Sequence, residues 1–94
     1  MADNIQIIHA TEGAAFVDGV RPVVLEFAAA MERVLRANEY KGGWEGSSNK
    51  YLFDYLCKEV EELANALDSN NCCHIQHEAI DAANLAMMLW DNNR

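Results

Sequence analysis

Apolar residues recur at helical spacing in three stretches of the chain, from about Pro22 to Tyr40, Lys50 to Leu67 and Cys72 to Asp91. In the first two stretches the apolar positions are three or four residues apart, which places their side chains on one face of a helix. In the third stretch they cover nearly the full circumference, a pattern typical of a helix buried on most sides. The pattern therefore predicts three helices, and the second should carry an apolar stripe at Leu52, Leu56, Val60, Leu63 and Leu67.

Short polar segments separate these helices. Gly42-Gly43 should end the first helix, because glycine readily adopts the left-handed conformation that follows a helix end. Ser47, Ser48 or Asn49 should cap the second helix. The short turn at Asp68–Asn71 makes the second and third helices antiparallel neighbours.

The small size of the chain affects how this fold is stabilised. A chain of 94 residues predicts one domain with a core that is only marginally stabilising. We therefore predict an all-α helical bundle of about three main helices per chain, completed by homo-oligomerisation into a four-helix-bundle-like unit, in a homodimer or homotetramer. The helical domain should span 21–94, and residues 1–20 should form an N-terminal arm or irregular segment, with Ile5–Ile8 either a short strand or an arm packed on a partner.

Charge and composition exclude several classes of protein. The formal net charge of -8 disfavours a nucleic-acid polymer as partner, because phosphate backbones bind basic surfaces. No apolar run is long enough to span a bilayer and the start does not resemble a signal peptide, so no membrane association is expected. These features predict a cytoplasmic protein whose three cysteines are reduced.

Two pairs of acidic residues carry the candidate chemistry. Glu59 and Glu62 form one pair, and Glu78 and Asp81 form the other, each with i, i+3 spacing on one side of a helix. The pairs lie at equal distances on either side of the predicted turn, so they should meet at similar heights on facing helices. Carboxylates beside an apolar surface are costly unless compensated, and Mg²⁺ favours carboxylate oxygens.

The arrangement E-x-x-E, turn, E-x-x-D on antiparallel helices resembles the MazG-like all-α nucleoside triphosphate pyrophosphohydrolases. The residues that carry the resemblance are Lys58–Leu63 and Glu78–Asn84, within a match from about Val24 to Trp90. Lys41-Gly42-Gly43-Trp44 is similar to the Trp-bearing loop that many members place before the first acidic pair. Many members have a second acid where this chain has Lys58, which implies fewer cations or a positive charge near the phosphates.

The resemblance implies a Mg²⁺-dependent enzyme, with Mn²⁺ as a substitute cofactor, that hydrolyses an NTP or dNTP to the monophosphate and pyrophosphate, in nucleotide-pool cleaning. It implies that Glu59, Glu62, Glu78 and Asp81 bind the metal and that Glu59 or Glu62 activates the attacking water. The residues it implies for substrate binding are Trp44 for the base, Lys41 and Lys58 for phosphate, and Asn84 for sugar or phosphate.

Two alternatives use the same residues differently. The chain could be a non-catalytic helical interaction module on the same scaffold, in which case it should assemble without metal and hydrolyse no nucleotide. A small zinc protein is the other alternative, with its site at Cys72, Cys73, His74 and His77. Adjacent cysteines chelate one tetrahedral ion poorly, which disfavours zinc.

Overall fold

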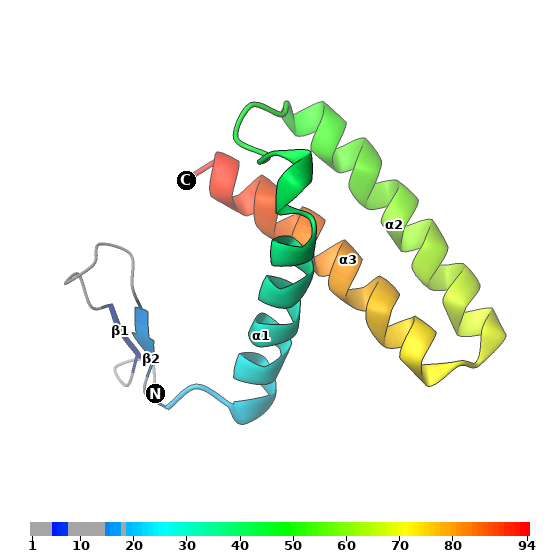
Figure 1. The fold of residues 1–94 in the computed structure, drawn as a ribbon, viewed down its shortest axis with the longest axis horizontal. Helices are drawn as coiled ribbons and strands as arrows, with labels where there is room; N and C mark the ends of the chain where they lie inside the picture. Colours follow the sequence, from blue (N-terminus) through cyan, green and yellow to red (C-terminus); the bar gives the residue numbers. More distant parts are fainter. Residues whose placement is uncertain (1–4, 8–14, 18) are drawn as a thin grey trace.

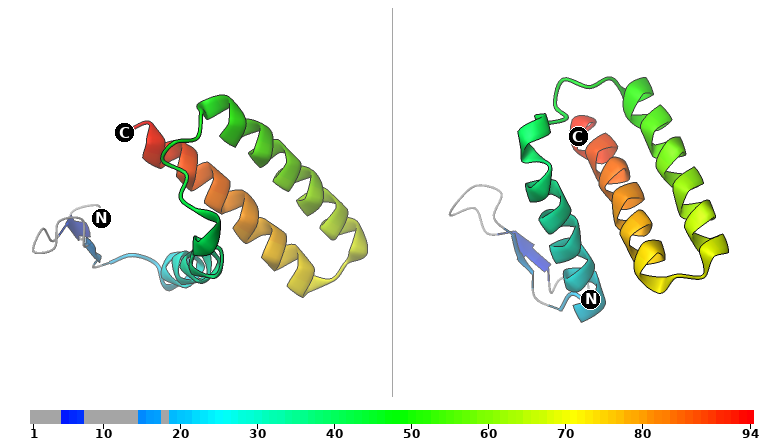
Figure 2. Two further views of the ribbon diagram at one scale, coloured as in Figure 1. Left: turned by 45° about the horizontal axis from the view of Figure 1, so that its top comes forward. Right: turned by 45° about the vertical axis from the view of Figure 1, so that its right-hand side comes forward.

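The computed structural model describes residues 5–7, 15–17 and 19–94. Three helices form its framework, as the sequence predicts: α1 spans Pro22–Ala37, α2 Asn49–Ser69 and α3 Cys72–Asn92. In Figure 1, α2 and α3 lie side by side and antiparallel, while α1 crosses α3. The two views of Figure 2 show the same arrangement, with α3 between the other two helices.

Two short strands precede the helices. Strand β1, Ile5–Ile7, pairs antiparallel with β2, Ala15–Val17. The sequence predicted a strand as one alternative for the first of these segments and did not predict the second. The remaining residues of the predicted arm, 1–4, 8–14 and 18, lie outside the described part of the chain.

Side-chain caps define where the two long helices begin. Ser48 accepts a hydrogen bond from the backbone N–H of Tyr51 at 3.0 Å and so caps α2. Asn71 accepts one from the N–H of His74 at 3.1 Å and caps α3. Between the helices, Asn70 adopts the left-handed conformation (φ 55°) that allows the chain to reverse within two residues.

The first helix ends earlier than predicted. Helix α1 stops at Ala37, because both the backbone N–H and the side-chain amide of Asn38 donate to the carbonyl of Val34 and close the last turn. A short 3₁₀ turn, η2, follows at Glu39–Lys41. Gly42 then has φ 93°, so the glycine ends this 3₁₀ turn and not α1 itself.

Polar residues make up half of the buried positions in the described part of the chain. The buried apolar residues are Leu52, Ala66 and Leu85. The buried polar residues are Glu59 and Glu78, each 8% exposed, and Asn84, 3% exposed. Full burial of a large apolar side chain contributes about 1.5–3 kcal/mol. Only two of the buried apolar residues, Leu52 and Leu85, are large, so the apolar core of the described chain stabilises the fold only slightly.

The predicted apolar stripe of α2 is only partly buried within the chain. Leu52 is buried, but Val60 and Leu67 are 50% and 57% exposed. The buried positions of α2 are spaced by seven, at Leu52, Glu59 and Ala66. A seam with this 3.5-residue period stays against α3, whereas the predicted stripe drifts around the helix.

Burial of α3 within one chain is incomplete. Its buried residues are Glu78, Asn84 and Leu85, and Trp90 is 62% exposed. The helix is covered by α2 on one side and α1 on another, so one chain leaves part of its circumference open. Across the described residues, no helix combines the length and hydropathy that a membrane span requires.

Candidate metal centre

The two acidic pairs meet between α2 and α3, as the sequence predicts. Carboxylate oxygens of Glu59, Glu62 and Glu78 lie within 4.8 Å of one another. Asp81 forms a second group with Glu78 and His77, whose ligand atoms also lie within 4.8 Å of one another. Glu78 belongs to both groups and connects the four carboxylates into one cluster.

Buried oxygens in this cluster lack hydrogen-bond partners. Within the described structure, Oε1 of Glu59 and Oε1 of Glu78 are buried and accept no hydrogen bond. A buried carboxylate oxygen without a donor is costly, and such a group requires an explanation. A bound cation would supply the missing interaction, so the residues fit a metal site.

The carboxyl of Glu59 has the most strongly shifted pKa in the cluster. The pKa of its carboxyl is raised from 4.5 to about 7, most by burial and then by the charges of Glu62, Asp81 and Glu78 and a hydrogen bond with Glu62. Burial and like charges both oppose ionisation. Without a cation, the first acidic pair therefore tends to retain a proton near neutral pH.

Asp81 lies at the edge of the cluster. Burial raises the pKa of its carboxyl, His77 lowers it, Glu62 raises it and Lys41 lowers it, and the net shift is upward. Lys41, at the end of η2, therefore lies near enough to Asp81 for its positive charge to affect that carboxyl. A lysine so close to a metal site can also contact a phosphate as a point charge.

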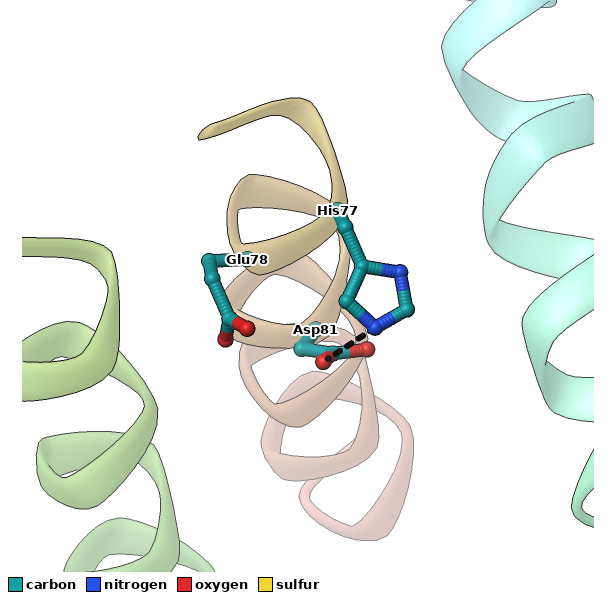
Figure 3. Close-up of side chains that lie close together, drawn as sticks. All are labelled: His77, Glu78 and Asp81. Atoms are coloured by element: carbon teal, nitrogen blue, oxygen red, sulfur yellow. Dashed lines mark ion pairs between the residues drawn. The ribbon is translucent and has the colours of Figure 1, made fainter. Parts of the chain in front are cut away.

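Two histidines pair with the acids of α3, a feature that the sequence analysis missed. His74 Nε2 lies 3.4 Å from Oε2 of Glu78, and His77 Nε2 lies 3.5 Å from Oδ2 of Asp81. Figure 3 shows the second pair and shows Glu78 on the side of α3 that faces α2. Both pairs have i, i+4 spacing, so the signal was present in the sequence.

A cavity of about 730 Å³ adjoins the cluster, between the α1–α2 connection and the α2–α3 pair. Five of the predicted metal-binding and substrate-binding residues line it: Lys41, Trp44, Glu59, Asp81 and Asn84. Glu62 and Glu78 do not line it. The volume falls in the range of small-molecule sites, about 300–1,000 Å³.

The C-terminal end of α3 fixes the position of Trp44. The indole Nε1–H donates to Oδ2 of Asp91 at 3.0 Å, and the side-chain amide of Asn92 donates to the carbonyl oxygen of Trp44 at 2.9 Å. The hydrogen bond from Trp44 lowers the pKa of the Asp91 carboxyl most, and a hydrogen bond from Arg94 lowers it further. No local motif signals a contact between residues so far apart in the chain.

Asn84 and Lys58 occupy very different environments. The Asn84 amide donates to the carbonyl oxygen of Met31 in α1 at 3.3 Å, and its buried Oδ1 accepts no hydrogen bond from the described residues. Lys58 is exposed and lines a separate, smaller hollow with Tyr51, Asp54 and Tyr55. The structure therefore brings Asn84 to the cavity and leaves Lys58 outside it.

The residues of the zinc alternative do not converge. Cys72 and Cys73 are exposed free thiols at the start of α3. Neither of the two potential ligand groups found among the described residues includes a cysteine. The two histidines of this segment pair with the acids instead.

Comparisons with known proteins place the chain in a family without identifying an activity. No protein-family model matches the chain, and no solved structure matches it. It is similar to an uncharacterized protein of Archaeoglobus fulgidus, with 32% identity over 63 residues that cover 67% of this chain and 68% of that protein. The chain therefore belongs to the same family as this archaeal protein.

Proposed function

We propose that the protein is a Mg²⁺-dependent nucleoside triphosphate pyrophosphohydrolase of the MazG-like type, which converts an NTP or dNTP to the monophosphate and pyrophosphate. The observation that carries the proposal is the convergence of four carboxylates from two helices, with buried, unpartnered oxygens on Glu59 and Glu78. Such a cluster is costly without a divalent cation, and all its carboxylate ligands are the hard oxygens that Mg²⁺ prefers.

The four acids would hold the cation, and Mn²⁺ would serve as a substitute. When bound, the cation neutralises phosphate charge and orients a water molecule for attack. Glu59 lines the cavity and Glu62 does not, which favours Glu59 as the group that accepts a proton from that water. Glu62 and Glu78 would complete the metal site beside Glu59.

The cavity supplies groups for the rest of a nucleotide. Trp44 lines it with its ring held by Asp91, and aromatic faces stack on nucleobases. Lys41 lines it close enough to influence Asp81 and would contact phosphate. Asn84 has a free acceptor for a sugar hydroxyl. Lys58 lies outside this cavity, so it would contact phosphate only if the phosphate extended into the smaller hollow that Lys58 lines.

A second copy of the chain would complete the fold in a homodimer or homotetramer. Helix α2 carries a line of apolar or small residues on a face that its own chain leaves exposed, and 11 large hydrophobic residues of the described chain are exposed in total. This exposed stripe of α2 consists of Phe53, Cys57, Val60, Ala64 and Leu67. Its residues alternate in steps of four and three, which is the spacing of a coiled-coil seam.

The same exposed stripe favours the second candidate function, a non-catalytic helical interaction module. An assembly of that kind needs the apolar face of α2 but not the buried acids of α3. The two functions differ in the role of Asp81, which an assembly without turnover does not use.

Product analysis tests the proposed function. The full-length protein is incubated with a panel of ribo- and deoxyribonucleoside triphosphates and Mg²⁺, and pyrophosphate and monophosphate are quantified. We expect equimolar release of both from at least one triphosphate, abolished by Asp81→Asn and retained by Asp68→Asn, a control at an exposed acid of α2. No pyrophosphate from any triphosphate, or equal turnover by the Asp81→Asn variant, would overturn the proposal.

A further inference from the structure

We infer that Asp91 and Asn92, in the last turn of α3, are positioning residues that hold the loop of Trp44 and so set the affinity for the substrate base without contacting the substrate. The inference rests on the proposed function and extends it beyond the cavity. Neither residue lines the cavity or belongs to the acidic cluster. Any effect of these residues on a substrate therefore passes through the loop.

The loop between η2 and α2, residues 42–48, has little support of its own. It is rich in glycine, at Gly42, Gly43 and Gly46. Glycine loses more conformational freedom on ordering than any other residue does. A hydrogen bond from the backbone N–H of Ser47 to the carbonyl oxygen of Trp44, at 3.0 Å, closes a turn inside the loop. The place of this turn against the cavity depends on contacts with another element.

The last turn of α3 provides these contacts. The side-chain amide of Asn92 donates to the carbonyl oxygens at both ends of the turn, at 2.9 Å for Trp44 and 3.4 Å for Ser47. Asp91 accepts the indole N–H of Trp44 at 3.0 Å. One residue thus holds the loop backbone and the other holds the ring, and Figures 1 and 2 show the loop passing beside the end of α3.

The bond to Asp91 also determines what the Trp44 side chain can offer a base. An indole has one hydrogen-bond donor and no acceptor, and here the donor is occupied. The same hydrogen bond lowers the pKa of the Asp91 carboxyl, so the acceptor is ionised at neutral pH and the bond is charge-assisted. The side chain is left with its ring faces, which suit stacking on a base.

Helix α3 thereby links the two ends of the proposed substrate site. Asp81 of the acidic cluster and Asp91 lie on the same continuous helix, about 15 Å apart along its axis. The helix therefore sets the separation between the metal site and the stacking ring. Loosening the loop should weaken binding of the base and leave the chemistry at the phosphates largely unchanged. Loss of Asp91 or Asn92 should then raise KM more than it lowers kcat.

Fluorescence and steady-state kinetics together test this inference. The full-length protein contains two tryptophans, so Trp90→Phe leaves Trp44 as the single reporter. In this background, Asp91→Ala and Asn92→Ala should each increase the quenching of Trp44 by acrylamide. On the preferred triphosphate with Mg²⁺, each should raise KM by about fivefold, as expected for a lost hydrogen bond, and change kcat by less than about twofold.

Asn93→Ala is the matched control, because Asn93 exchanges side-chain hydrogen bonds with Asn49 at the start of α2 and not with the loop. It should keep the wild-type KM and quenching. Asp91→Asn retains an acceptor oxygen and should recover most of the KM lost in Asp91→Ala. Unchanged KM or quenching in either Asp91→Ala or Asn92→Ala, or an equal change in Asn93→Ala, would overturn the inference while wild-type turnover still supports the proposed function. Absence of turnover by the wild type would overturn both.

Discussion

Glu59 of α2 and Glu78 of α3 face each other across the helix pair, and each buries one carboxylate oxygen that no described residue contacts through a hydrogen bond. Two such groups at the centre of a small chain oppose folding, because burial and mutual repulsion both disfavour their charges. The proposed cation would offset both effects, so the proposal predicts that the stability of the folded state depends on whether a cation is bound.

Neutral substitutions in the cluster should stabilise the metal-free protein. Glu59→Gln removes a charge repelled by Glu62, Asp81 and Glu78, so it should raise the melting temperature in EDTA. Each kcal/mol gained corresponds to about 4–8 °C for a domain of this size. Differential scanning calorimetry measures the change, with Glu61→Gln at an exposed position of α2 as the matched control. A lower melting temperature for Glu59→Gln than for the control would contradict the repulsion argument.

Stability of the metal-free protein should also fall with rising pH. The Glu59 carboxyl has a pKa of about 7 in the folded chain against its usual 4.5, so the folded state holds more protons than the unfolded state between these values. The contribution of this group to stability is therefore full below about pH 4.5 and is lost as pH rises through 7. Melting in EDTA from pH 5 to 8 should show this decline, and Glu59→Gln should flatten it. A decline of the same size in the variant would assign it to other groups.

The tryptophan in the cavity should affect substrate binding more than turnover. Replacing Trp44 with Ala removes a stacking surface worth about 1–3 kcal/mol per base, so KM should rise by about tenfold with a smaller change in kcat. Trp44→Phe keeps an aromatic face but loses the hydrogen bond to Asp91, so its KM should lie between those of the wild type and the alanine variant. Steady-state kinetics on the preferred triphosphate provide the measurement. An unchanged KM in the alanine variant would show that this ring does not contact the base.

The exposed stripe of α2 should hold the assembly together. Val60→Glu places a charge in the middle of this stripe, at a position that is 50% exposed in the single chain, so it should weaken association without disturbing the contact with α3. Sedimentation velocity should show smaller species than for wild type, whereas Glu61→Lys on the neighbouring exposed position should assemble normally. An unchanged sedimentation profile for Val60→Glu would exclude this face as the contact between copies.

Much of the fold followed from local patterns. Apolar spacing located all three helices, and the Ser48 cap of α2 is one of the three candidates that the sequence offered. The meeting of Glu59 with Glu78 also followed, because a short turn between two regular helices fixes their relative height. Periodicity and helix geometry suffice for such features, since they depend on neighbours in the chain.

Other features required the three-dimensional structure. Apolar spacing alone does not distinguish a face that packs within the chain from one left exposed, so the predicted stripe joined the buried Leu52 to the half-exposed Val60 and did not include the buried Glu59. The hydrogen bond from Trp44 to Asp91 joins distant segments and leaves no local signature. The contact between His77 and Asp81 does have a local signature, their i, i+4 spacing. The sequence analysis instead grouped His77 with the adjacent cysteines as ligands of the zinc alternative.

Calorimetric titration of the metal-free protein with Mg²⁺ tests the central claim most directly. The wild type should bind Mg²⁺ saturably, and its melting temperature should rise with concentration, since a ligand at 100 times its Kd adds about 2.7 kcal/mol to the folded state. The double variant Glu59→Gln/Glu78→Gln should show neither effect, while Glu61→Gln should match the wild type. Equal Mg²⁺ binding by the double variant and the wild type would contradict the claim that these facing carboxylates form the metal centre.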